Sequence, residues 1–304
     1  MMSEKGSDIL FAGGTAIILW ASAFAGIRAG LTAYSPLHLA FLRMLIGSLG
    51  LAGFALLTGL RLPDFRDIPI ILLAGFSGFT VYHLALNIGE VTVSAGPSSL
   101  IVASSPVFTA LLATFRHRER LSTRGWLGTA VCFAGVALVA LGTDGTFHWR
   151  SGIFWILLAA FSESFYFVIQ RPYLQKYGTI AFTTYTIWAG TLFMACGAPG
   201  VTADIQSASL AANLSVLYLG IFPTAVAYLA FAYATLRAGS TKSSASIYLT
   251  PVIAVLIAWF WLGEVPDGRS MIGGIVVMIG VLLVSRGVTV NRKFRNSSIP
   301  KKLR

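Results

Sequence analysis

Ten apolar runs, each long enough to cross a lipid bilayer as a helix, constrain the fold of this chain more than any other feature. A bilayer core of about 30 Å requires about 20 apolar residues per helix. The runs lie near residues 8–28, 36–57, 68–88, 95–115, 125–141, 151–171, 179–197, 211–235, 242–262 and 270–287. Only 11% of the residues are charged, against roughly one quarter in soluble domains. The sequence therefore predicts an all-α membrane protein with ten transmembrane helices and no folded soluble domain.

The basic residues gather on one side of the predicted membrane, although a net charge of +11 could by itself suggest a nucleic-acid partner. The side with the N-terminus, the even-numbered loops and the C-terminus holds 18 of the 22 lysines and arginines. Basic loops face the cytoplasm, so both termini are predicted to be cytoplasmic, in a bacterial inner membrane and without nucleic acid. The basic tail either contacts anionic headgroups or only sets topology, and the second interpretation is favoured.

An internal repeat underlies this pattern. Residues 105–142 align without a gap onto residues 250–287, at a constant offset of 145 residues. The matches that are not simply apolar are Pro106 with Pro251, Glu119 with Glu264, Arg124 with Arg269, Gly128 with Gly273, Gly135 with Gly280 and Gly142 with Gly287. Such a combination indicates duplication.

The number of spans in each copy fixes the orientation of the copies. Each copy contains five spans, and an odd number makes the second copy enter the membrane from the opposite side. We therefore expect two inverted five-helix repeats, at residues 1–145 and 146–290, and a basic tail at 291–304. Inverted repeats are typical of secondary transporters, whose sites lie between the halves and which work by alternating access. The sequence predicts such a carrier, with a central cavity between the repeats.

No motif for an enzyme, a metal or a cofactor is present in the sequence. A zinc-binding His-Glu-x-x-His, a Gly-x-Ser-x-Gly elbow and a phosphate-binding loop are all missing. A passive channel stays an alternative, although the charged rings or filter loop that channels use are missing. We therefore expect neither an enzyme nor a pump driven by ATP, and no cofactor or metal.

Two loops carry a resemblance to a known family. They are Arg118-Glu119-Arg120-Leu121-Ser122 and Trp261-Leu262-Gly263-Glu264, each lying between a helix with a proline near its start and a glycine-rich helix. They resemble the paired EamA units of the drug/metabolite transporter superfamily, and Trp20 to Phe24 and Pro36 followed by Arg43 also fit that pattern.

The resemblance implies ten helices, a central cavity and export of small metabolites, frequently amino acids. YddG-type amino-acid exporters are the most similar branch. Nucleosides, nucleotide sugars and amphipathic drugs are the alternative cargo. The oligomeric state is left open, and a monomer is compatible with this architecture.

Polar residues inside spans are costly and are therefore candidates for the substrate site. Tyr82, His83 and Asn87 stand close together in the third span, and the repeat places Tyr228 opposite His83. These side chains either line the cavity or form hydrogen bonds between helices. A histidine also titrates near neutral pH.

The sixth span carries a polar stripe of Glu163, Tyr166 and Gln170. Glu163 either binds a substrate ammonium or a proton, or holds helices together as a neutral or arginine-paired side chain. Arg43 is the available cation, and snorkelling to headgroups is favoured over a position in the pore. The energy source is open between facilitation and proton antiport, with Glu163 and His83 as the titratable candidates.

The fourth and ninth spans begin with serine-rich segments, which suit sliding helices. Ser99, Ser244 and Tyr248 are candidates for substrate contact there. Pro106 and Pro251 remove backbone hydrogen bonds from the same spans, so each marks either a hinge or gate or a fixed kink.

The first span supplies two aromatic candidates, Trp20 and Phe24, one turn apart. They either form an apolar pocket for a substrate side chain or pack between helices. Glu119 and Glu264 lie in loops at opposite membrane surfaces, so capping of a helix or pairing of a loop with a helix is expected rather than chemistry.

Overall fold

Helices make up nearly all of the computed structural model, which describes every residue of 1–304 except 1–3, 118–119, 141–150, 239–246, 266 and 290–304. Within that part, nine helical runs are long and apolar enough to cross a membrane, and Thr250–Leu262 is a shorter apolar helix. The all-α membrane fold is thus confirmed. The start of the predicted ninth span lies outside the described residues.

The first half of the chain forms the following elements: α1 (Glu4–Gly30), α2 (Pro36–Thr58), η1 (Phe65–Asp67), α3 (Ile68–Gly75), η2 (Phe76–Val81), α4 (Tyr82–Thr92), α5 (Ala95–Val102), α6 (Ser105–His117), β1 (Arg120–Leu121) and α7 (Thr123–Ala140). Local signals set their ends. Ser35 caps α2 by accepting from the His38 N–H at 3.2 Å. Gly59 ends α2 with φ +63°, a conformation that favours glycine.

The second half repeats much of this order: α8 (Ser151–Tyr177), α9 (Thr179–Met194), η3 (Ala195–Gly197), α10 (Val201–Ser207), α11 (Leu210–Leu219), η4 (Gly220–Val226), α12 (Ala227–Ala238), η5 (Ile247–Leu249), α14 (Thr250–Leu262), α15 (Gly268–Gly287) and β2 (Val288–Thr289). α6 and α14 begin and end at positions related by the offset of 145 residues. The repeat seen in the sequence is therefore also present in the backbone.

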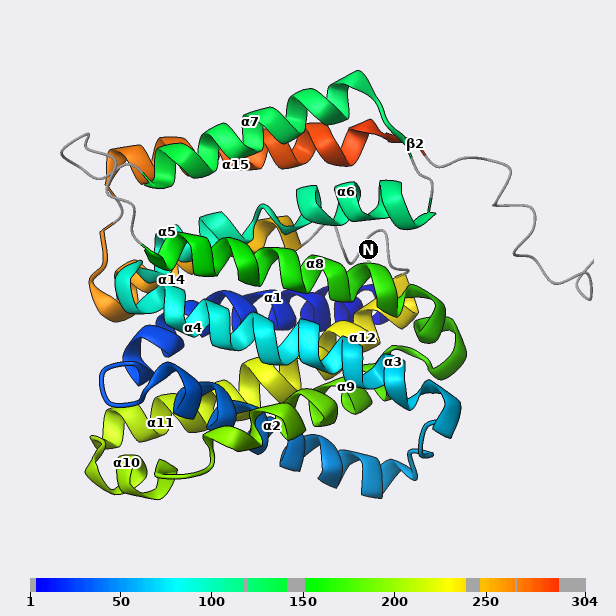
Figure 1. The fold of residues 1–304 in the computed structure, drawn as a ribbon, viewed down its shortest axis with the longest axis vertical. Helices are drawn as coiled ribbons and strands as arrows, with labels where there is room; N and C mark the ends of the chain where they lie inside the picture. The colour runs from blue at the N-terminus through cyan, green and yellow to red at the C-terminus, as the bar shows by residue number, and fades with distance from the viewer. Residues whose placement is uncertain (1–3, 118–119, 141–150, 239–246, 266, 290–304) are drawn as a thin grey trace, which may run out of the picture.

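Helices α7 and α15 form a close antiparallel pair at one edge of the molecule (Figure 1). A Cβ atom on Gly135 would lie 2.8 Å from the carbonyl oxygen of Gly273, and one on Gly273 would lie 2.9 Å from that of Gly135. Only glycine allows backbones to approach this closely. Gly135 and Gly273 both belong to glycine pairs that the repeat matches. Their contact is the one expected when two matched helices pack antiparallel. The short strands β1 and β2 pair antiparallel beside them.

Two π-helical segments interrupt the third and eighth spans at equivalent positions. η2 lies between α3 and α4, and η4 lies between α11 and α12. The second contains Pro223, which cannot donate a backbone hydrogen bond. Single π turns inside helices often occur at functional sites, and both segments here lie beside the candidate site described below.

The fourth span is divided where one continuous helix was predicted. α5 ends at Val102 and α6 begins at Ser105, with Pro106 as its second residue. Pro251 is likewise the second residue of α14. Because the first helical turn does not need the proline N–H, proline is well tolerated there. Both prolines mark helix starts, and a hinge or gate at either one stays a prediction.

The two ends of the bundle are distinguished by the elements that finish there. α1 and α4 finish, and α5 begins, at the end that we name the Glu264 end, on the left in Figure 1. α2 and α8 finish at the opposite end, where the chain starts.

Candidate functional site

The side chain of Phe79 is fully buried and forms the centre of an aromatic cluster made by both halves. Its ring centroid lies 6.2 Å from that of His83, 5.3 Å from that of Tyr166 and 5.7 Å from that of Tyr228. The structure thus brings His83 and Tyr228, which the repeat related, to the same ring. Tyr82 packs edge to face against His83 at 4.9 Å. We name this group, with Trp20, the central cluster.

Trp20 joins the cluster from α1. Its ring lies 5.1 Å from Tyr228 and 5.0 Å from Phe231, and its Nε1 donates to the carbonyl oxygen of Pro223 at 3.2 Å. Phe24, one turn further along, is 5% exposed in the hydrophobic core. Trp20 is therefore oriented by a hydrogen bond to the π-helical segment η4, whereas Phe24 is a packing residue in this state.

Arg43 is buried beside the central cluster, with 3% of its surface exposed. Its Nε donates to Thr224 Oγ1 at 3.3 Å, and Thr224 donates to the carbonyl oxygen of Leu219 at 2.8 Å. The guanidinium lies within electrostatic range of Tyr82, Tyr228 and Glu90. Among the described residues, no carboxylate forms an ion pair with it.

The prediction that Arg43 snorkels to the headgroups is wrong for this structure. Its helix face turns toward η4, because Gly47 and Gly220 let α2 and η4 approach closely. The side chain therefore points into the protein rather than along the lipid. A buried cation that forms no ion pair is costly, which makes Arg43 a candidate for the functional site.

Glu163 brings a carboxylate to the same region from α8. Its Oε2 accepts from the Ser105 hydroxyl at 2.8 Å, at the first residue of α6. The carboxylate lies within electrostatic range of Tyr82 and Tyr228. An arginine-paired Glu163 is not what the described residues form, and the carboxylate stands instead at the break in the fourth span.

The remaining central residues are buried between helices. Asn87 is fully buried, and its Nδ2 donates to the Pro36 carbonyl oxygen at 3.0 Å. The hydroxyl oxygen of Tyr166 lies 3.5 Å from Thr186 Oγ1, and either oxygen can be the donor. Both residues therefore bond to other helices, and a role in lining a cavity stays a prediction for them.

Ser99 and Tyr248 of the serine-rich segments make contacts within the protein. Ser99 donates to the Gly96 carbonyl oxygen in its own helix at 2.6 Å. Tyr248 is half-buried next to Ser285 of α15. Ser244 lies outside the described residues. The structure thus gives Ser99 and Tyr248 contacts other than the predicted substrate contact.

A polar clamp joins the two halves at the Glu264 end. Arg28 Nε lies 3.4 Å from Glu264 Oε1, and the other Glu264 oxygen accepts from the Ala95 N–H at 2.9 Å. Ala95 is the first residue of α5, so the carboxylate caps that helix. The predicted capping role is confirmed for Glu264, while Glu119 lies outside the described residues. We name these three residues the Glu264 clamp.

Glu90 is a buried carboxyl group that sequence reasoning missed. It is 0% exposed, and neither carboxyl oxygen has a hydrogen-bond partner among the described residues. The predicted third span stopped at residue 88, whereas α4 continues to Thr92. The available signal was spacing, because Glu90 follows His83 and Asn87 on one helix face.

Two more contacts hold the Glu264 end together. Tyr34 donates to Asn213 Oδ1, and His38 Nδ1 lies 2.6 Å from Asp204 Oδ2. Burial raises the pKa of Tyr34, and the nearby Asp204 carboxylate raises it further. The loop between α1 and α2 is thereby tied to the second half.

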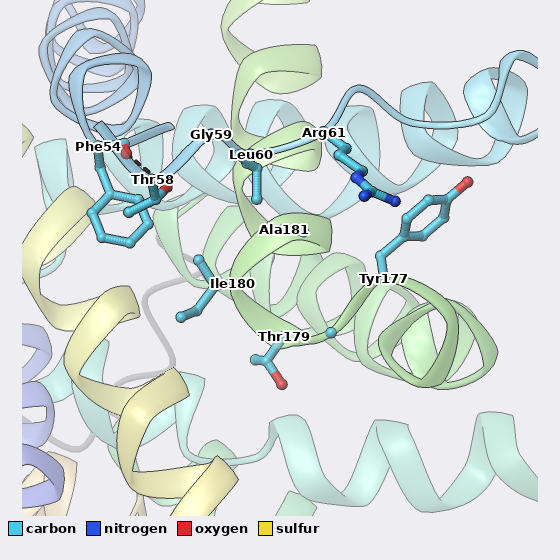
Figure 2. Close-up of a pocket in the computed structure, with 10 residues that line it drawn as sticks. Phe54, Thr58, Gly59, Leu60, Arg61, Tyr177, Thr179, Ile180 and Ala181 are labelled. Carbon is cyan, nitrogen blue, oxygen red and sulfur yellow. Dashed lines mark hydrogen bonds between the residues drawn. The ribbon is translucent and has the colours of Figure 1, made fainter. Parts of the chain in front are cut away.

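The opposite end carries a cavity of about 410 Å³ between the end of α2 and the junction of α8 and α9 (Figure 2). Arg61 and Tyr177 lie on one side of it. An exposed ion pair crosses this end, with Lys176 Nζ 2.6 Å from Asp67 Oδ2. The cavity is lined by none of the predicted site residues, so we place the candidate site at the central cluster.

The central cluster brings together groups of several chemical kinds. Within the described part of the chain, no three His, Cys, Asp or Glu side chains gather in a way that could hold a metal ion. The cluster offers one guanidinium, one carboxylate and several aromatic faces. These groups are of both charge signs and of apolar character.

Comparison with known proteins identifies similar chains. A model of the EamA-like transporter family matches residues 8–141 and again residues 150–286. The chain is 49% identical to the uncharacterized transporter YdfC of Bacillus subtilis (strain 168), over 92% of each chain. It is 37% identical to a probable terminal-alkyne amino-acid exporter of Streptantibioticus cattleyicolor, over 93% of this chain and 95% of that one.

Two more distant similarities were found. The chain is 27% identical to YedA, an uncharacterized inner membrane transporter of Escherichia coli (strain K12), over 89% of this chain and 88% of that one. A solved crystal structure with 20% identity superposes with a TM-score of 0.62, covering 92% of this chain and 97% of the other. This second likeness supports the fold alone.

Proposed function

The chain belongs to the EamA-like transporter family, and we propose that this secondary transporter exports amino acids by alternating access. The carrying observation is the charge pattern of the centre. Arg43 comes from the first half and Glu163 from the second, and both lie within electrostatic range of Tyr82 and Tyr228. A zwitterion offers a carboxylate to the guanidinium and an ammonium to the carboxylate.

The arrangement of hydrogen bonds leaves these charges available. Arg43 uses Nε for Thr224, which leaves the outer guanidinium nitrogens for a bidentate contact with a carboxylate. Glu163 uses one oxygen for Ser105. The aromatic rings of Trp20 and Phe79 supply an apolar wall for the side chain of the cargo. The name of the Streptantibioticus relative also supports an amino-acid cargo.

The alternative cargo fits this centre less well. A nucleotide sugar carries two phosphates and calls for several buried cations, and among the described central residues Arg43 is the buried arginine. Nucleosides and amphipathic drugs lack the carboxylate that an unpaired guanidinium favours. They remain the competitors that the experiment must include.

Orientation follows from charge. We place both termini in the cytoplasm of a bacterial cell, because one side of the membrane holds 18 of the 22 basic residues. The inner-membrane location named for YedA supports the same membrane. The Glu264 end then faces outward and is closed by the Glu264 clamp. Opening of that end, with closure of the opposite one, completes alternating access.

Counterflow in proteoliposomes tests the proposal. The purified chain is reconstituted, the vesicles are loaded with unlabelled compound, and uptake of the labelled compound is followed for a panel of amino acids, a nucleoside, a nucleotide sugar and an amphipathic cation. We expect saturable counterflow for at least one amino acid, reduced at least tenfold by Glu163→Gln. Counterflow of a panel member other than an amino acid, without exchange of or competition by any amino acid, would overturn the proposed cargo.

A further inference from the structure

The side chain of Thr224 is placed by the π-helical register of η4. Its hydroxyl donates to the carbonyl oxygen of Leu219, five residues earlier, at 2.8 Å. A threonine in an α-helix bonds to a carbonyl three or four residues earlier, as Thr184 does to Ile180 at 2.9 Å. Backbone hydrogen bonds in a π-helix also span five residues. The Thr224 hydroxyl therefore follows the register of its own segment.

Pro223 favours this register. Proline has no backbone N–H, so Pro223 cannot donate to the Leu219 carbonyl oxygen, four residues earlier, as an α-helix requires. In a π-helix the backbone partner of a carbonyl is the residue five positions later, which here is Thr224. The proline therefore shifts the hydrogen-bond partner of Leu219 from position 223 to Thr224.

The far end of η4 leaves a carbonyl oxygen for the central cluster. The Ala227 N–H donates to the Phe222 oxygen, five residues earlier, so the Pro223 oxygen loses the donor that it would have in an α-helix. The indole Nε1 of Trp20 donates to the Pro223 oxygen instead, at 3.2 Å. The π-helical segment thus orients one aromatic residue of the central cluster through its backbone.

Thr224 transmits the geometry of η4 to Arg43. The hydroxyl proton of Thr224 is committed to Leu219, so its oxygen is left as an acceptor, and Arg43 Nε donates to it at 3.3 Å. Both side chains are buried, and Thr224 is 0% exposed. The nitrogens of a guanidinium share one plane, so a held Nε restrains the plane of the two outer nitrogens. These outer nitrogens form the fork that binds a carboxylate at two points.

We propose that Thr224 is the positioning residue that gives Arg43 its preference for a carboxylate, an inference that rests on the proposed function. A free arginine loses side-chain freedom when it binds a ligand, whereas an arginine already held by Thr224 loses less. The benefit reaches a cargo that bonds to both outer nitrogens. A free amino acid therefore gains from Thr224, and its methyl ester, which lacks the carboxylate, does not.

The other π-helical segment offers no such group. The repeat places Phe79 of η2 at the position of Thr224, and a phenyl ring cannot accept the Nε–H of an arginine in the way that a hydroxyl does. The corresponding position in the first half thus supplies the aromatic centre of the cluster. Among the described residues, positioning of the cation is a property of η4.

Two substitutions separate the hydroxyl of Thr224 from its packing. Thr224→Val keeps the branched shape and loses the hydroxyl, whereas Thr224→Ser keeps the hydroxyl and loses the methyl group that faces Gly47. In proteoliposome counterflow, Thr224→Val should raise the half-saturation concentration for the free amino acid about fivefold. Thr224→Ser should stay within about twofold of wild type. An unchanged Thr224→Val, or a Thr224→Ser that is impaired as much or more, would overturn the proposal.

The methyl ester of the same amino acid, used as a competitor, gives a readout that a merely structural role would not move selectively. Thr224→Val should leave competition by the ester within about twofold of wild type, so the preference for acid over ester falls about fivefold. Added to Arg43→Gln, Thr224→Val should change nothing further, because Thr224 acts through Arg43. Equal weakening of acid and ester, or a further fivefold loss in the double variant, would count against the proposal.

Nitrogen-15 NMR of the full chain tests the contact without any cargo. The Nε–H signal of Arg43 is assigned by its loss in Arg43→Lys. We expect this signal to shift in Thr224→Val, which removes the acceptor, and to keep its position in Thr224→Ser. A signal that keeps its position in Thr224→Val would also overturn the proposal. If Thr224→Val does not fold, Thr224→Ala replaces it in every assay with the same expected results.

The outcomes separate the two proposals. Absence of amino-acid counterflow in the wild type removes the proposed cargo, and the NMR signal of Arg43 then decides whether Thr224 holds the guanidinium. Amino-acid counterflow that is the same in wild type and Thr224→Val keeps the proposed cargo and overturns the positioning role.

Discussion

Two helix crossings beside the central cluster share one backbone geometry and differ in their side chains. At one crossing, a Cβ on Gly47 of α2 would lie 3.1 Å from the Gly220 carbonyl oxygen of η4. At the other, a Cβ on Gly190 of α9 would lie 3.0 Å from the Gly75 carbonyl oxygen that precedes η2. Gly75 and Gly220 are related by the offset of 145 residues, whereas Gly47 and Gly190 are 143 residues apart, so the two crossings correspond with a shift of two residues in the partner helix. Each crossing lies against a π-helical segment.

The side chains around these crossings differ in charge. Four residues before Gly47 stands Arg43, and four residues before Gly190 stands Thr186. Thr224 faces Gly47, whereas Phe79 faces Gly190. Duplication therefore explains the shared backbone, and the two sides of the site have acquired different groups. A zwitterion is itself asymmetric, so a site with the cation on one side matches it better than a symmetric site would.

Removal of the cation should have the largest effect. Arg43→Gln should raise the half-saturation concentration for amino-acid counterflow about 100-fold, because charged hydrogen bonds contribute about 1.5–3 kcal/mol. The half-saturation concentration of Arg43→Lys should lie between those of wild type and Arg43→Gln, because lysine keeps the charge but lacks the planar guanidinium. Thr186→Val, at the corresponding position of the other crossing, should change the half-saturation concentration less than about threefold. Equal losses at both crossings would contradict an asymmetric site.

The two crossings should respond alike to added bulk. Gly47→Ala and Gly190→Ala should each lower the free energy of unfolding by about 1–3 kcal/mol. The new Cβ would overlap Thr224 Cγ2 in one case and lie 2.6 Å from Phe79 Cβ in the other. Thermal unfolding in detergent measures the change. Gly53→Ala is the control, because nothing lies within 4 Å of its Cβ position. Tolerance at one crossing alone would break their correspondence.

The carboxylate side of the site should depend on the broken fourth span. Ser105→Ala removes the hydroxyl that donates to Glu163 at 2.8 Å. A hydrogen bond of this kind contributes about 1 kcal/mol, so we expect a rise of about fivefold in the half-saturation concentration for counterflow. Ser99→Ala, which loses only a bond within its own helix, is the comparison variant. A larger effect at Ser99 than at Ser105 would place the cargo elsewhere.

The smallest effect is expected far from both crossings. Lys176 is 45% exposed at the end opposite the Glu264 clamp, and exposed ion pairs contribute about 0–1 kcal/mol. Lys176→Gln should therefore lower thermal stability only slightly, and the difference should shrink as salt is added. A loss comparable to that of Gly47→Ala would show that this ion pair holds the bundle together.

The spans and the repeat could be predicted because lipid imposes a length and an apolar composition on every helix. The pairing of His83 with Tyr228 followed from the same offset. Such arguments depend on the lengths of apolar runs and on the offset of the repeat, and both can be read directly from the sequence. They do not reveal a break such as the one between α5 and α6, where Ser104 and Ser105 look like any small residues of a membrane helix.

Arg43 and Glu90 were misjudged for a different reason. An arginine in a span can either snorkel to the headgroups or be buried, and the residue type alone does not distinguish the two. The outcome for Arg43 depends on whether its face of α2 meets lipid or η4. That depends on Gly47 and Gly220, which are far apart in the sequence. Glu90 was missed because the hydrophobic run ends before the helix does, and a carboxyl group near a span end usually reaches water.

Substrate discrimination at Arg43 tests the central claim most directly. Counterflow of a transported amino acid is compared with that of its methyl ester, which keeps the ammonium and loses the carboxylate, in wild type and in Arg43→Gln. The account predicts that wild type favours the free amino acid about 100-fold and that the preference disappears in the variant. Equal exchange of acid and ester by the wild type would contradict a site in which Arg43 holds the carboxylate.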